Sequence, residues 1–136
     1  RSSNPRQEEP WRYPERYGPR APSFARAMRA PAPFERTLFV SGTASIVGHA
    51  SRHHEDVLAQ VDETLRNLEE VARSSGVPER GRDWFLKIYL RDAADLDAVR
   101  ARLRETFGAE TPMLFLRADV CRPELALETE GVLASG

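Results

Sequence analysis

The chain has 136 residues, of which 40% are hydrophobic and 30% charged, and its formal net charge at pH 7 is -1. This length suits one domain whose core needs no disulfide or metal to hold it together. The single cysteine excludes an internal disulfide, and no apolar run approaches the roughly 20 residues of a membrane span. No signal peptide is visible either, so we expect a cytoplasmic protein that does not bind membranes.

Residues 1–36 are rich in proline and arginine, and we call them the arm. The arm contains seven of the ten prolines, whose spacing excludes a long helix because proline has no amide proton to donate. Its eight arginines and four glutamates give a charge of +4, which leaves -5 on the rest of the chain. A nucleic-acid-binding domain carries its basic face on the folded part, so we expect no nucleic-acid partner. The aromatic residues of the arm predict that it is extended along a protein surface.

Residues 37–48 predict a strand, a bend of small residues and a second short strand. The first strand covers Thr37 to Val40, and the second covers Ala44 to Val47. Gly42 lies between them and permits either a simple corner of the sheet or the close approach of a ligand. The residues alone leave both interpretations open.

A helix is predicted from His54 to Ser75, because apolar residues recur there at steps of three and four. These residues are Val57, Leu58, Val61, Leu65, Leu68 and Val71. Gly76 is expected to end the helix. The nearby histidines at 49, 53 and 54 do not have the spacing of metal ligands, so we expect neither a metal nor another cofactor.

The next segment predicts a strand followed by a second helix. From Trp84 to Arg91 apolar residues alternate with Phe85, Lys87, Tyr89 and Arg91, which share the opposite face. Asp92 then has the position of a helix cap, and Gly108 the position of a helix end.

Two further strands, 113–121 and 125–132, are separated by the break at Arg122-Pro123. In the second strand two glutamates alternate with Leu125 and Leu127, so they face away from the apolar side. If the two strands are adjacent and antiparallel, their polar side chains share one patch of sheet. This patch consists of Arg117, Asp119, Cys121, Glu128 and Glu130.

The order of elements predicts an α/β fold with a mixed sheet and two helices packed on one face. The other face is then left for a partner or for a pocket. The apolar faces assign nine residues to the core, namely Leu65, Leu68, Leu86, Ile88, Leu96, Val99, Leu103, Leu116 and Leu127.

Several separated motifs resemble the C-terminal half of the chorismatases, which remove pyruvate from chorismate in polyketide pathways. They are Ser41-Gly-Thr-Ala-Ser-Ile-Val-Gly-His-Ala-Ser51, Glu63-Thr-Leu-Arg-Asn-Leu68, Tyr89-Leu-Arg-Asp92, Ala118-Asp-Val-Cys-Arg122 and Leu127-Glu-Thr-Glu-Gly131. Within the arm, the segments Asn4–Gln7 and Tyr17–Ala27 resemble the stretch that joins the two chorismatase halves. The resemblance implies a RidA (YjgF) fold for residues 37–136, with a homotrimer or a missing N-terminal half as the partner.

The resemblance also implies a site for a chorismate-like carboxylate. Glu128 is expected to be the acid that protonates the enol ether, and Glu130 either tunes its pKa or pairs with an arginine. Arg91, at the end of its strand, is the first choice for binding a substrate carboxylate. The other expected binding residues are Tyr89, Arg20, Gly42, Ala44 and Cys121, of which Ala44 and Cys121 shape the pocket.

A second class of function remains open at this stage. A RidA-like domain without catalytic activity binds a small carboxylate or serves only in assembly. Imine or enamine deamination is a further alternative, but the RidA deaminases have an arginine two residues after the proline that opens the penultimate strand. Here the residue at that position, after Pro112, is Leu114.

Overall fold

Five strands form the main sheet in the order β1-β2-β7-β5-β6, and the computed structural model describes all 136 residues. The strands are β1 (Ala27–Arg29), β2 (Thr37–Thr43), β5 (Arg82–Leu90), β6 (Met113–Arg117) and β7 (Leu127–Ser135). β5 and β6 are parallel, whereas the other neighbouring pairs are antiparallel. Two short strands, β3 (Ile46–Val47) and β4 (Ala50–Ser51), form a separate ladder. The predicted mixed sheet is therefore confirmed.

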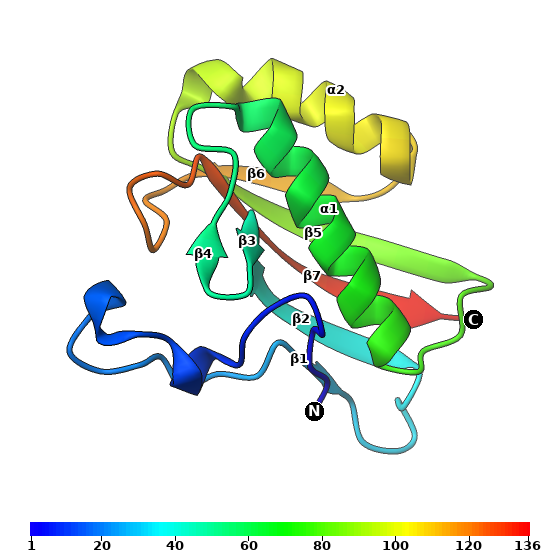
Figure 1. Ribbon diagram of the computed structural model, residues 1–136. Coiled ribbons are helices and arrows are strands. Elements are labelled where there is room, and N and C mark those ends of the chain that lie inside the picture. The colour runs from blue at the N-terminus through cyan, green and yellow to red at the C-terminus, as the bar shows by residue number, and fades with distance from the viewer.

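The helices α1 (Val57–Ser74) and α2 (Leu96–Phe107) lie on the same side of the sheet (Figure 1). The side chain of Asp56 accepts a hydrogen bond from the amide of Ala59 at 2.9 Å and so caps α1. The predicted start at residue 54 was too early, because His53 and Glu55 have positive φ angles of 57° and 66°.

Three short 3-10 helices complete the local structure, and they cover Pro10–Arg12, Glu15–Tyr17 and Ala93–Asp95. Asp92 caps the third, since its side chain accepts a hydrogen bond from the amide of Ala94 at 2.9 Å. The predicted cap is thus confirmed, although its first turn is a 3-10 helix that leads into α2.

The core lies between the helices and the sheet. Six of the nine predicted core residues are fully buried, and they are Leu68, Leu86, Ile88, Val99, Leu103 and Leu127. Leu65 and Leu96 pack against them and are partly buried. The prediction for Leu116 was wrong, because β6 is an edge strand on which Met113 and Phe115 face the helices and Leu116 faces away.

The last two strands are not adjacent, so the condition for a shared polar patch is not met. β7 lies between β2 and β5, whereas β6 pairs only with β5, to which α2 connects it in parallel. β6 ends at Arg117, so Asp119 and Cys121 belong to the loop before β7. The expected polar patch is therefore divided among the end of β6, the loop and the central strand β7.

The arm contributes to the sheet as well as lying beside it. Its residues 27–29 form β1 and pair with β2, and Ser2 forms an isolated bridge with Ala27. No helix longer than three residues occurs in it. The arm runs below the β3–β4 ladder in Figure 1, where it has the blue colours. A boundary at residue 36 stays a prediction.

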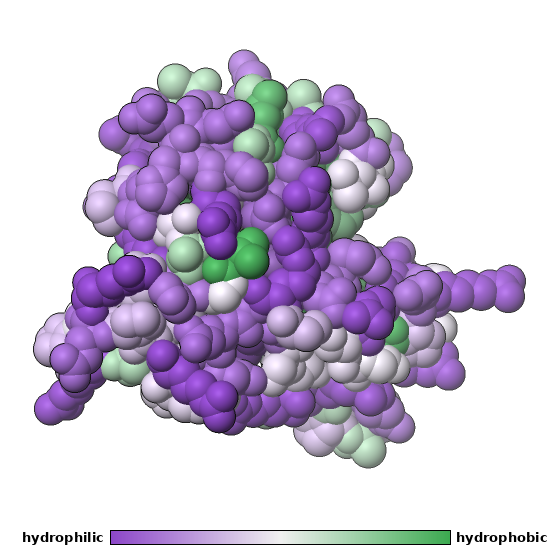
Figure 2. Space-filling model, viewed as in Figure 1, coloured by the Kyte–Doolittle hydropathy of each residue, from purple (hydrophilic) through white to green (hydrophobic).

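The two faces of the sheet differ in character. The side that bears the helices has a mostly hydrophilic surface (Figure 2). On the opposite face of the sheet, which we call the open face, five large apolar side chains are exposed. They are Met28, Phe39, Phe85, Leu114 and Leu116.

Candidate active site

A pocket of about 330 Å³ lies where the arm meets β2, β7 and the loop before β7. Its walls are Tyr13, Tyr17, Pro22, Phe24, Arg26, Ser41, Gly42, Ala44, Ile46, Cys121, Arg122 and Glu128. Four of the residues that the sequence singled out, Gly42, Ala44, Cys121 and Glu128, meet here. The other three, Arg20, Tyr89 and Arg91, do not line this pocket.

Glu128 is the only carboxylic acid that lines the pocket. It lies on β7 directly opposite Tyr89 of β5. Its side chain has neither a hydrogen bond nor an ion pair to stabilise a negative charge. Burial raises the pKa of Glu128, and the charge of Glu130 raises it further. The protonated form, which can donate a proton, is therefore more favoured than in an exposed glutamate.

Gly42 makes room for this carboxyl group. A β-carbon at position 42 would lie 2.7 Å from Cδ of Glu128, well inside van der Waals contact. β2 also shifts its register against β7 between Val40 and Thr43, so a bulge occurs at this point. The glycine at position 42 therefore allows the side chain of Glu128 to lie against the backbone of β2.

Two arginines in the pocket were missed by the sequence analysis. Arg26 is 4% exposed, and its Nη2 donates to the carbonyl of Glu8 at 2.8 Å and to the hydroxyl of Tyr13 at 2.6 Å. Its Nε is buried without a hydrogen-bond partner. Arg26 forms no ion pair, so a buried positive charge is left for an anion to neutralise.

Arg122 is the second of these arginines and is 7% exposed. One nitrogen, Nη1, donates to the carbonyl of His49 at 2.8 Å and to Oγ of Ser51 at 3.0 Å. The other guanidinium nitrogens make no hydrogen bond, and no carboxylate pairs with Arg122. Two guanidinium groups and one carboxyl group with a raised pKa therefore share the pocket.

The aromatic residues of the arm pack against both arginines. The guanidinium carbon of Arg122 lies 3.7 Å from the ring centroid of Tyr17. That of Arg26 lies 5.3 Å from the ring of Phe24 and 5.6 Å from that of Tyr13. The aromatic residues of the arm could have indicated the two arginines in the sequence, since guanidinium groups stack on aromatic faces.

Arg91 has a different position from the one expected. Its guanidinium donates to the carbonyls of Leu125, Val120 and Arg122 at 3.1, 3.0 and 2.9 Å. It also pairs with Asp119 at 2.9 Å. These contacts use the donors that a ligand would need, so Arg91 positions the loop that carries Cys121 and Arg122.

Replacing Arg91 with Ala should therefore reduce stability rather than ligand affinity. We expect the free energy of unfolding in urea to fall by about 2 kcal/mol, because three loop carbonyls lose a charged donor. Arg117→Ala is the control, since Arg117 is exposed at the end of β6 and forms no ion pair, and it should change stability by less than about 0.5 kcal/mol. An Arg91→Ala protein as stable as the parent would contradict this role.

Tyr89 and Arg20 also lie outside the pocket. The hydroxyl of Tyr89 donates to Glu130 at 2.9 Å, and Glu130 also pairs with Lys87. The hydrogen bond from Lys87 is the main reason that the pKa of Glu130 is lowered. Glu130 thus pairs with a lysine rather than with an arginine. Arg20 is exposed and forms no ion pair.

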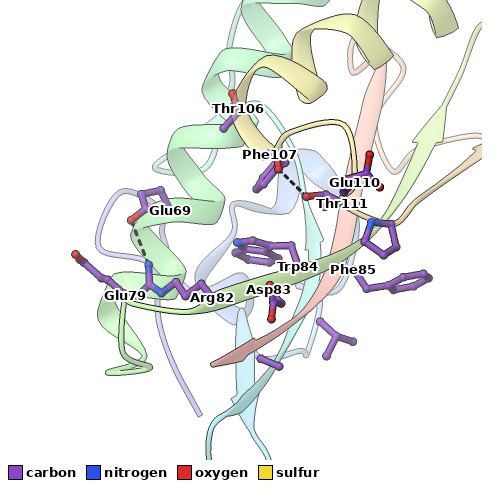
Figure 3. A pocket seen from close by; sticks show the side chains of 13 residues that line it. Glu69, Glu79, Arg82, Asp83, Trp84, Phe85, Thr106, Phe107, Glu110 and Thr111 are labelled. Atoms are coloured by element: carbon purple, nitrogen blue, oxygen red, sulfur yellow. Dashed lines mark hydrogen bonds and ion pairs between the residues drawn. The ribbon is translucent and has the colours of Figure 1, made fainter. Parts of the chain in front are cut away.

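A larger hollow of about 870 Å³ occurs at the other end of β5 and β7, around Trp84 and Phe85 (Figure 3). Its only basic residue is Arg82. The guanidinium of Arg82 is occupied by Glu69 and by the carbonyls of Val77 and Pro78. This hollow therefore offers no free cation to a carboxylate ligand, and the smaller pocket is the better candidate.

No group of three or more histidine, cysteine and acidic side chains is arranged to hold a metal ion. No helix is both long enough and apolar enough to cross a membrane.

The fold and the pocket together define a domain of RidA/YjgF type with an acid and two arginines in one cavity. The YjgF gene product of E. coli has this fold, with a TM-score of 0.62 at 16% identity over 82% of this chain and 87% of that one. No family model matches the sequence.

Greater similarity is found among the chorismatases. A chorismatase of known structure aligns with a TM-score of 0.88 and 36% identity, over 98% of this chain and 43% of that one. The 3-hydroxybenzoate synthase of Streptomyces hygroscopicus is 40% identical over 142 residues, which cover 96% of this chain and 42% of that protein. The resemblance to chorismatases is thereby confirmed: the chain is a RidA/YjgF-like domain homologous to about two fifths of these relatives.

Proposed function

We propose that this domain carries the active site of a chorismatase-like enzyme, which cleaves the enol ether of chorismate and releases pyruvate. The observation that supports this most is the joint presence of Glu128, Arg26 and Arg122 in one pocket. Chorismate has two carboxylates, which guanidinium groups bind well. Cleavage of its enol ether requires one proton donor, and Glu128 is a carboxyl group with a raised pKa in the same pocket.

The reaction starts with a proton transfer from the Glu128 carboxyl group to the methylene carbon of the enol ether. The electron pair of the double bond forms the new C–H bond, which leaves a cation on the adjacent carbon. Water adds to that carbon and loses a proton, which restores the carboxyl group. The resulting hemiketal divides into pyruvate and a ring alcohol, which is a dihydroxycyclohexadiene carboxylate. This is the final product, or it loses one water molecule to become a hydroxybenzoate.

The remaining pocket residues shape the cavity. Although Cys121 is exposed overall, desolvation raises the pKa of its thiol, so the thiolate is disfavoured. We therefore assign Cys121 to the wall of the pocket together with Ala44, and not to nucleophilic catalysis. As part of the proposal, the activity belongs to a polyketide pathway.

The test is to incubate the chain with chorismate and to measure pyruvate through NADH oxidation by lactate dehydrogenase. If the gene encodes a longer product, that product is assayed in parallel. Pyruvate release by either protein supports the proposal. If neither releases pyruvate, the RidA-like binding or assembly function is the better interpretation. Deamination is the weaker alternative, because Leu114 lies exposed on the open face where an arginine anchor is expected.

We also propose that the open face is covered by further copies of the chain in a trimer, or by another domain of a longer protein. Its exposed apolar side chains support this, since such rows are usually buried in an interface. Phe39→Asp should dissociate the assembly, as measured by analytical ultracentrifugation. Phe34→Asp is the control, because Phe34 is exposed in the turn before β2. A parent that sediments as a monomer would exclude the trimer.

A further inference from the structure

We propose that Tyr17 is a positioning residue for Arg122, and that this pair clasps residues 9–24 over the pocket. We call residues 9–24 the strap. The ligand part of the inference rests on the proposed function, whereas the clasp itself does not. The strap supplies four walls of the pocket, namely Tyr13, Tyr17, Pro22 and Phe24.

The backbone of the strap is attached to the body of the protein only at its ends. On one side, the amide of Glu8 donates to the carbonyl of Gly48 at 2.8 Å. On the other, the amide of Ser41 donates to the carbonyl of Arg26 at 3.1 Å. All backbone hydrogen bonds that start within the strap also end within it, in its two 3-10 turns. Side chains must therefore hold it in place.

The closest cation–π contact of the strap is that of Tyr17 with Arg122. The ring centroid lies 3.7 Å from the guanidinium carbon, which is a close cation–π contact. The hydroxyl of Tyr17 lies 3.2 Å from Nδ1 of His49, and the two rings are 5.8 Å apart. Tyr13 adds a second attachment, since its hydroxyl accepts a hydrogen bond from Arg26.

The stack also fixes the orientation of Arg122. Its Nη1 is held by the carbonyl of His49 and by Ser51, while the ring of Tyr17 covers one face of the guanidinium. The plane of the group is thus set by two contacts, and its remaining nitrogens are left to donate to an anion. Such preorganisation reduces the entropy that is lost when an anion binds. Closure of the strap and the orientation in which Arg122 can bind an anion therefore depend on the same contact with Tyr17.

Limited trypsin digestion tests the clasp, because the strap contains the cleavage sites Arg12, Arg16 and Arg20. The rates of cut at these sites are measured by mass spectrometry, with and without 3-hydroxybenzoate as the probe. If cleavage requires opening, a probe concentration of ten times its dissociation constant should slow it about tenfold.

Three variants separate the role of the ring from a general effect on folding. Tyr17→Leu removes the ring, and it should speed strap cleavage and weaken probe binding, each by about 3- to 10-fold. Tyr17→Phe retains the ring and should restore both values to within about threefold of the parent. Phe34→Leu, in the exposed turn before β2, is the control and should change neither.

Two results would overturn the proposal. One is a Tyr17→Leu protein that is cleaved and binds the probe like the parent. The other is a Tyr17→Phe protein that is as impaired as Tyr17→Leu, which would assign the effect to the hydroxyl. If the parent itself does not bind the probe, the proposed ligand class fails. In that case faster cleavage of Tyr17→Leu still supports the clasp, and unchanged cleavage overturns it.

Discussion

Replacing Glu128 with Gln is expected to reduce pyruvate release from chorismate by at least about 100-fold, which is the usual contribution of a general acid. Glutamine keeps the length of the side chain and its hydrogen-bonding capacity, but it has no acidic proton to deliver. Because the pocket retains Arg26 and Arg122, binding of 3-hydroxybenzoate should remain close to that of the parent. Initial rates in the pyruvate assay and titration calorimetry measure the two effects separately.

The same assignment predicts the dependence of activity on pH. Burial, with a smaller effect from Glu130, raises the pKa of Glu128, so the acid stays protonated at pH values where an exposed glutamate is ionised. The chemical step should therefore slow as the pH rises through this elevated pKa. A pH profile of kcat that has no acidic group with a raised pKa would contradict the role of Glu128.

Glu110→Gln provides the matched control for this substitution. Glu110 lines the larger hollow near Trp84 and forms no ion pair, so the same chemical change occurs far from the pocket (Figure 3). It should leave the rate of pyruvate release unchanged. If Glu128→Gln has the activity of the parent, Glu128 is structural and another group must supply the proton.

Much of the fold was predictable because its signals are local. The steps of three and four in α1 and the alternation in β5 depend only on neighbouring residues, and both elements occur where expected. The alternation of Leu127 and Glu128 likewise predicted that Leu127 faces the core and that Glu128 faces away from it. The order of strands was not predictable in this way, because the central position of β7 depends on pairing with β2 and β5 from distant parts of the chain.

Only part of the lining of the candidate site was named from the sequence, for a similar reason. Glu128, Gly42 and Cys121 were identified from motifs, and they do line one pocket. The two arginines beside them lie in irregular segments, which have no period from which an orientation could be derived. Arg91 follows the last residue of β5, so its place in the sheet was predictable. Its hydrogen-bond partners belong to the loop before β7, and the alternation of residues in a strand does not predict the conformation of a loop.

Arg122→Gln should weaken the binding of 3-hydroxybenzoate about 10- to 100-fold, because a charge-assisted hydrogen bond to the carboxylate is lost. Arg122→Lys keeps the charge and should still be impaired, since an ammonium group neither binds a carboxylate bidentately nor stacks flat on Tyr17. Arg117→Gln is the control for net charge, because Arg117 is exposed at the end of β6 and has no ion pair. Titration calorimetry at constant ionic strength gives all four affinities.

The double variant Tyr17→Leu/Arg122→Gln then connects this prediction with the clasp. If Tyr17 acts on the ligand through Arg122, its removal should cost little more once the guanidinium is gone, so the two effects on affinity should not add. Additive losses would mean that Tyr17 contacts the ligand independently. An Arg122→Gln protein that binds the probe like the parent would transfer the anchoring role to Arg26, whose buried Nε is the other unpartnered donor in the pocket.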